Sequence, residues 1–156
     1  MAVGVGDPAP AFSLEGVHEG ERRTYALADH AGRTIVLVLY PGDDSPVCTR
    51  QLTSYTDDLA QFDHVGAQIL AVSPQGLDSH EKFASAQGLG FPLLADTDKV
   101  LFEAYGSLGP IGFPRRSIFV IDGDGVIRYA HRALAGLGFK RSAELVAAVR
   151  DLEAGS

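Results

Sequence analysis

The sequence predicts an α/β fold in which a central mixed β-sheet is flanked by helices. The run TIVLVLY at residues 34–40 is apolar without alternation, as expected for a central strand covered on both faces. Strand-like and helix-like patterns then alternate along the chain, which ends in a hairpin and a last helix. At 156 residues the chain is long enough for one core, so we expect a single domain over residues 1–156.

The first part of the chain predicts a hairpin, the central strand and a helix. Residues 11–14 and 23–26 flank the polar stretch 15–22, which predicts an N-terminal β-hairpin. After the central strand, apolar residues recur at three- and four-residue spacing and mark one buried helical face: Leu52, Tyr55, Leu59 and Phe62. A helix is therefore expected directly after Cys48.

The middle of the chain predicts two more strands and two more helices. Residues 68–73 are typical of a second buried strand. The stretch DSHE at residues 78–81 is a cap-like start for a helix that runs to about Gln87 and stops at Gly88. A short strand at residues 92–95 and a short helix at residues 98–105 follow.

The last part predicts a hairpin and a final helix. Residues 117–122 and 126–133 flank the turn GDG at residues 123–125. These glycines fit turn chemistry better than phosphate binding, because no helix follows to supply N–H groups. Ser142 is expected to cap a helix that buries apolar side chains at helical spacing: Leu145, Val146, Val149 and Leu152.

The composition argues against several classes of partner. The chain has 13 Lys and Arg against 20 Asp and Glu, a formal net charge of -7, and no basic cluster interleaved with aromatics, so nucleic acid and anionic membranes are not expected partners. The N-terminus lacks the basic start and apolar stretch of a secretory leader, and no run approaches membrane-spanning length. A lone cysteine is best preserved in a reducing compartment, so the expected location is the cytoplasm.

Cys48 is the only cysteine, and it directly follows the central strand in the segment YPGDDSPVCT. If the chain turns there into a helix, Cys48 lies in the first helical turn, where unpaired N–H groups and the macrodipole favour a thiolate. A free cysteine is by itself more often a small buried hydrophobe. Its position at the carboxyl end of a strand, where α/β folds build their sites, favours a reactive role instead.

The motif PxxxSxxC, formed by Pro41, Ser45 and Cys48, resembles the PxxxTxxC signature of peroxiredoxins, with a serine that retains the hydroxyl. The resemblance covers nearly the whole chain in order, through residues 5–12, 71–73, 91–96 and 116–122. The spacing is most similar to the bacterioferritin comigratory protein subfamily, also called peroxiredoxin Q. This resemblance implies a thioredoxin-like fold and the reduction of hydrogen peroxide and organic hydroperoxides without metal, haem or flavin.

The resemblance also implies roles for single residues. Cys48 is the expected peroxidatic nucleophile, Pro41 shields its pocket, and Ser45 holds the peroxide. Arg116 faces the thiolate from a neighbouring strand, and the adjacent Arg115 is the rival for that role. An arginine at a strand start is by itself more often an exposed charge, but the family spacing favours Arg116.

The expected reaction is in-line attack of the thiolate on one peroxide oxygen, while the other leaves as hydroxide or alkoxide. A thiol with a pKa of about 8.5 is already a few per cent ionised at neutral pH, so full ionisation gains only roughly thirtyfold. Faster catalysis needs donors that bind the transition state. We assign this task to Arg116, Ser45 and the backbone N–H groups of Val47 and Cys48.

Two positions depart from the subfamily pattern. Thr53 stands where many members carry a resolving cysteine, so an external thiol is expected to reduce the Cys48 sulfenic acid: thioredoxin, a glutaredoxin-like protein or a low-molecular-weight thiol. Gln51 stands where the family usually has glutamate. Asp43 and Asp44 would also oppose thiolate formation if buried, but loop aspartates are usually solvated.

The histidines do not predict a metal site. They are scattered along the chain, and no pair has the spacing of a zinc motif: His18, His30, His64, His80 and His131.

Two other functions stay open at this stage. A dithiol–disulfide oxidoreductase on the same fold normally needs two cysteines, as in C-x-x-C, which this chain lacks. A redox sensor or binding protein would use Cys48 oxidation to change a surface or to link two chains. The sequence has no obvious extension for ring assembly, so a monomer or small homodimer is expected.

Overall fold

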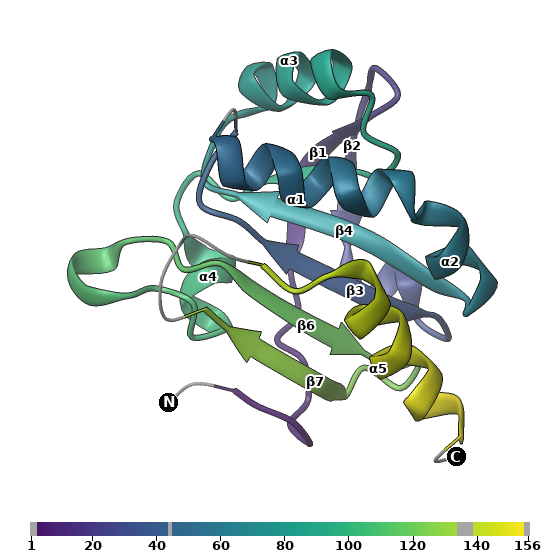
Figure 1. Ribbon diagram of the computed structural model, residues 1–156. Coiled ribbons are helices and arrows are strands. Elements are labelled where there is room, and N and C mark those ends of the chain that lie inside the picture. Colours follow the sequence, from purple (N-terminus) through teal and green to yellow (C-terminus); the bar gives the residue numbers. More distant parts are fainter. Residues whose placement is uncertain (1–2, 44, 134–138, 155–156) are drawn as a thin grey trace.

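The computed structural model describes residues 3–43, 45–133 and 139–154. They form one seven-stranded mixed sheet in the order β2-β1-β5-β4-β3-β6-β7, with helices packed against it (Figure 1). The strands are β1 (Ser13–His18), β2 (Glu21–Ala26), β3 (Thr34–Leu39), β4 (Ala67–Ser73), β5 (Leu93–Ala95), β6 (Ser117–Ile121) and β7 (Ile127–Arg132). The helices are α1 (Pro46–Asp57), α2 (Leu59–His64), α3 (Leu77–Gln87), α4 (Val100–Ala104) and α5 (Ser142–Ala154), with 3-10 turns η1 (Leu27–His30) and η2 (Pro110–Gly112).

The central strand β3 is covered on both faces, as predicted. Val36 and Val38 pack into the apolar cluster that contains the buried faces of α1, α2, α3 and α5. Leu37 and Leu39 point to the opposite face, where they meet α4 and the N-terminal segment. Figure 1 shows α1, α2 and α5 on the near face of the sheet. The absence of alternation in this strand therefore reflects two buried faces.

The N-terminal hairpin is confirmed, but its strands are longer than predicted. The β1 and β2 register runs from Ser13 opposite Ala26 to His18 opposite Glu21, so the turn is only Glu19 and Gly20. β2 is the edge of the sheet and most of its side chains are exposed. Polar residues that suggested a loop are thus the solvent face of an edge strand.

Two helix predictions need correction. The helix expected from Cys48 through Phe62 is two helices, α1 and α2, which meet at Asp58. α5 begins at Ser142 itself, whose buried side-chain oxygen has no hydrogen-bond partner in the described part of the chain, so Ser142 does not cap it. By contrast, α3 ends as predicted, because Gly88 adopts the left-handed conformation at φ 62°.

The sheet topology brings three connections to one edge. β3, β4 and β5 run parallel, so their carboxyl ends lie together. β6 is antiparallel to β3 and pairs Ser117 with Leu39, which places the start of β6 beside the end of β3. The β3–α1 connection, the start of α3 and the residue before β6 therefore meet at this edge. None of the helices in the described ranges is long and apolar enough to cross a membrane.

Candidate active site

Cys48 lies in the first turn of α1 and is fully buried. Ser45 is the N-cap of this helix, and its Oγ accepts a hydrogen bond from the Cys48 backbone N–H at 3.3 Å. Pro46 occupies the first helical position, where a missing N–H costs nothing. The helix start expected from the sequence is confirmed, and it places the sulfur near the positive end of the α1 dipole.

Arg116, rather than Arg115, reaches the sulfur. The Arg116 side chain is buried, and its Nη2 donates to Cys48 Sγ at 3.3 Å. Arg115 is half-buried, and its Nε donates to the Ala133 carbonyl oxygen at 2.7 Å. Successive residues of an extended chain point to opposite sides, so only one of the two can face the β3–α1 connection.

Gln51 holds the other arm of Arg116, a contact that the sequence reasoning missed. The buried Gln51 Oε1 accepts from Arg116 Nη1, and its Nε2 donates to Tyr55 Oη at 3.2 Å. The Tyr55 hydroxyl donates in turn to the Lys140 carbonyl oxygen at 2.5 Å. Burial raises the pKa of Tyr55, although the Gln51 hydrogen bond lowers it in part. The available signal was spacing, because Gln51 lies one helical turn after Cys48.

Within the described ranges, Arg116 forms no ion pair with a carboxylate. Its neighbours are the Cys48 sulfur and the neutral Gln51 amide. A buried guanidinium without a counter-charge is costly. A thiolate at Cys48 provides that counter-charge.

The Asp43 side chain is buried, which contradicts the expectation that the loop aspartates are solvated. Its Oδ1 accepts from the Tyr40 hydroxyl, and its Oδ2 accepts from Ser79 Oγ and His80 Nδ1, each at 2.7 Å. Burial by itself would raise the pKa of Asp43. The hydrogen bond and charge of His80, together with the two hydroxyl donors, nevertheless hold that pKa below its usual value. Asp44 lies outside the described residues.

The other predicted site residues lie around this centre. Pro41 directly follows the buried Tyr40 and is half-buried itself. The Val47 N–H has no hydrogen-bond acceptor among the described residues, whereas the Cys48 N–H is already bound by Ser45.

Comparison with known proteins identifies the family. The sequence profile of the AhpC/TSA family matches residues 5–130. The chain belongs to the AhpC/TSA family. It is 33% identical over 136 residues to thioredoxin peroxidase of Echinococcus granulosus, covering 82% of this chain and 70% of that protein. The structure of Xanthomonas campestris peroxiredoxin Q has 31% identity and a TM-score of 0.78, over 90% of each chain.

Family membership confirms the predicted fold and the class of activity. The structure of Mycobacterium bovis AhpC superposes with a TM-score of 0.88 over 100% of this chain and 96% of that one, and at 23% identity this likeness speaks for the fold alone. The sheet with its N-terminal strand pair is the thioredoxin-like fold of peroxiredoxins. The chain is a thiol-dependent peroxidase, with a peroxide as substrate and a thiol as reductant.

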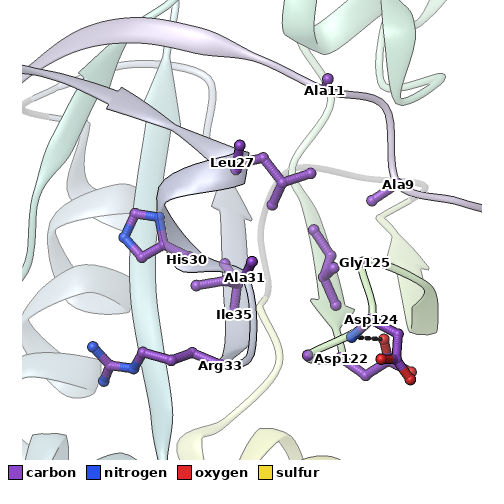
Figure 2. A pocket seen from close by; sticks show the side chains of 13 residues that line it. Ala9, Ala11, Leu27, His30, Ala31, Arg33, Ile35, Asp122, Asp124 and Gly125 are labelled. Carbon is purple, nitrogen blue, oxygen red and sulfur yellow. Dashed lines mark hydrogen bonds between the residues drawn. The ribbon is translucent and has the colours of Figure 1, made fainter.

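This peroxiredoxin also has a cavity that lies away from Cys48. A cavity of about 250 Å³ is lined by small and apolar side chains with a few charged ones, among them Leu27, Arg33, Ile35 and Asp122 (Figure 2). Ile35 lies near the start of β3, whereas Leu39 at its other end pairs with Ser117 beside the site. The turn at residues 123–125 forms part of this wall, and Asp122 Oδ1 accepts from the Asp124 N–H at 2.9 Å. The glycines of this stretch, Gly123 and Gly125, therefore belong to a turn, as predicted.

No group of three His, Cys, Asp or Glu side chains in the described part of this peroxiredoxin could hold a metal ion. Of the scattered histidines, His80 is fully buried and belongs to the Asp43 contacts.

Proposed function

We propose that this peroxiredoxin reduces hydrogen peroxide and organic hydroperoxides through Cys48, and that an external thiol reduces the resulting sulfenic acid. The observation that carries the proposal is the 3.3 Å contact between Arg116 Nη2 and Cys48 Sγ at a buried helix start. Arg116 meets no carboxylate in the described part of the chain, so its charge acts on the sulfur.

The reaction follows from the donors around the sulfur. The Cys48 thiolate attacks the nearer peroxide oxygen, the S–O bond forms, and the O–O bond breaks. The leaving oxygen departs as hydroxide or alkoxide and takes up a proton. Among the described residues, neither the buried Arg116 Nε nor the Ser45 hydroxyl donates to an acceptor. These groups, with the Val47 N–H, supply the stabilisation of developing charge that we assign to the site.

Reduction of the sulfenic acid requires an outside thiol and an opening of the site. The chain has no second cysteine, and Thr53 Oγ1 donates to the Thr49 carbonyl oxygen at 2.7 Å. Cys48 is fully buried, so both the peroxide and the incoming thiol reach its sulfur only after residues around the first turn of α1 move. The external thiol then forms a mixed disulfide with Cys48, and a second thiol releases the reduced enzyme.

The finer assignments belong to the same proposal. The name of the Echinococcus granulosus relative makes thioredoxin the first reductant to test, before a glutaredoxin-like protein or a low-molecular-weight thiol. We place the enzyme in the cytoplasm, where a lone cysteine stays reduced. We also assign it a monomeric or small homodimeric state. The redox-sensor alternative is not favoured by family membership.

The test is a single-turnover trapping experiment. The reduced protein is mixed with one equivalent of peroxide for a few seconds, quenched with a sulfenic-acid trap, and weighed by intact mass spectrometry. We expect near-complete trapping, none in Cys48→Ser, and peroxide turnover once a thiol is supplied. A thiol that stays mostly unmodified would overturn the proposal, and slow oxidation without thiol-supported turnover would favour the sensor.

A further inference from the structure

The strongest unassigned feature is a buried polar cluster of Tyr40, Asp43, Ser79 and His80, which we call the loop anchor. We propose that the loop anchor positions the peroxide-binding segment between β3 and α1, with the Asp43–His80 pair at its centre. These are positioning residues, because they act through Pro41 and Ser45 rather than on the substrate. The proposal rests on the peroxidase function proposed above.

The segment between β3 and α1 needs such an anchor, because its backbone is almost unsupported. The last sheet-like bond runs from the Tyr40 N–H to the Val72 carbonyl oxygen at 2.9 Å. Between Tyr40 and Ser45, the one backbone group of a described residue with a hydrogen bond is the Asp43 N–H, which donates to Gln75 Oε1. The side chain of Asp43 therefore decides where this segment lies.

The loop anchor ties this segment to two other elements. Asp43 Oδ2 accepts from Ser79 Oγ and His80 Nδ1 of α3, each at 2.7 Å. On its other side the His80 ring continues to β5, with Nε2 lying 2.9 Å from the Leu94 carbonyl oxygen. The parallel ends of β3, β4 and β5 make this bridge possible, because they bring the three connections to one edge.

The hydrogen bonds determine the charge state of the pair. A carboxylate and a backbone carbonyl can only accept, so both His80 ring nitrogens carry a proton. The His80 and Asp43 side chains are 0% and 1% exposed, so a positive ring faces a negative carboxylate out of water. The pair is electrically neutral as a whole, which keeps the buried Asp43 charge from opposing the Cys48 thiolate.

Such a pair contributes specificity of position more than stability. Removing two charges from water offsets much of their attraction, so an apolar pair of similar volume would stabilise a fold as well. The four hydrogen bonds of the loop anchor, however, are directional, so all of them form in only one arrangement of the loop. Arg116 is held separately by Gln51, so loss of the anchor shifts Pro41 and Ser45 against an unchanged Cys48–Arg116 contact.

The experiment compares two electrophiles on three variants. Asp43→Ala removes the anchor, Ser79→Ala removes one of its bonds, and Asp43→Asn can keep every bond with a neutral His80. Rates are measured with hydrogen peroxide and with iodoacetamide, which alkylates the thiolate without using the peroxide donors. The exposed Asp63→Ala serves as the matched control, and urea unfolding confirms that each protein is folded.

We expect Asp43→Ala to lose about 100-fold in the peroxide rate, Ser79→Ala several-fold, and Asp43→Asn less than about threefold. The iodoacetamide rate of Asp43→Ala should rise, because a released loop exposes the sulfur. A folded Asp43→Ala with the wild-type peroxide rate, or with equal losses towards both electrophiles, would overturn the proposal. If Asp43→Ala does not fold, the same criteria apply to Ser79→Ala.

The test separates the two proposals. If the Cys48 thiol of the wild type does not react with peroxide, the proposed function fails. The loop anchor is then tested by the iodoacetamide rate alone. An iodoacetamide rate that is unchanged by Asp43→Ala would then count against the anchor, and an increased rate would support it.

Discussion

At the residue scale, the site depends on a buried guanidinium that meets a sulfur and an amide. Arg116 forms no ion pair with a carboxylate in the described residues. Its Nη2 donates to the Cys48 sulfur, and its Nη1 donates to Gln51 Oε1. Since a lone buried charge is costly, the arginine and the Cys48 thiolate stabilise each other. Two substitutions test the two contacts of Arg116 separately.

Arg116→Lys should lower the second-order rate with hydrogen peroxide by about 100-fold, because an ammonium cannot reproduce the fork that holds the sulfur, Gln51 and the peroxide together. Stopped-flow kinetics measures the rate. Arg115→Lys is the matched control and should stay within about threefold, since Arg115 is bonded to the Ala133 carbonyl oxygen. A similar loss in both variants would contradict the assignment of Arg116.

Gln51→Glu should slow the reaction with hydrogen peroxide by on the order of tenfold, because a buried carboxylate beside Arg116 would offset the guanidinium charge that faces Cys48 and the peroxide. Stopped-flow kinetics measures the rate, with Cys48→Ser as the blank. Gln61→Glu adds the same charge on the exposed surface of α2 and should leave the rate unchanged. A wild-type rate in Gln51→Glu would contradict the role assigned to the Arg116 charge.

At the element scale, the start of α1 combines a helix cap with a group that we propose binds the peroxide. Ser45 adopts the extended conformation of an N-cap, with φ -70° and ψ 140°, and accepts from the Cys48 N–H. The hydroxyl oxygen thereby caps the helix, and under this proposal its proton is donated to a peroxide. Serine and threonine can both fill this double role, which is why the motif tolerates the serine.

Ser45→Ala should lower the free energy of unfolding by about 1 kcal/mol and also slow the peroxide reaction, because the cap and the donor are lost together. Ser45→Thr should retain stability within a few tenths of a kcal/mol and keep most of the rate. Urea unfolding and stopped-flow kinetics measure the two effects. Ser54→Ala, in the middle of α1, is the control, and an equally fast and stable Ser45→Ala would refute the double role.

At the scale of the whole molecule, the sheet topology decides which residues share the site. The loop anchor joins the β3–α1 connection to α3 and β5, and Arg116 joins it to β6. These elements are far apart in the chain and meet because parallel and antiparallel strands end at one edge. Because the buried Asp43 is ionisable, the stability of this arrangement also depends on pH.

Ionisation of Asp43 should make part of the free energy of unfolding depend on pH. Because the folded state lowers its pKa, this contribution is present above the ordinary unfolded value of about 4 and is lost as pH falls through the folded value. Between pH 5 and about pH 3, the free energy of unfolding of the wild type should therefore fall more than that of the double variant Asp43→Asn, His80→Gln, which lacks both ionisable groups of the pair. Urea unfolding at several pH values tests this, and parallel curves for the two proteins would contradict it.

Local sequence patterns predicted most helices and strands correctly. They failed where solvent exposure or packing in the folded protein determined the structure. The apolar run of β3, a helix start around Cys48 and the stop at Gly88 depend on neighbours in sequence. The edge strand β2 was underestimated, because exposed strand faces and loops share polar composition. Ser142 failed as a cap because its hydroxyl is buried inside the packed structure, which composition does not report.

By itself the sequence determined the fold class, the family resemblance, the reactive Cys48 with Ser45 in its motif, and the lack of a second cysteine. These are properties of short segments or of the complete residue list. Only the tertiary structure decided that Arg116 rather than Arg115 reaches the sulfur, that Gln51 holds it, and that Asp43 is buried against His80. Those outcomes depend on strand register and on burial, which arise when elements distant in the chain pack together.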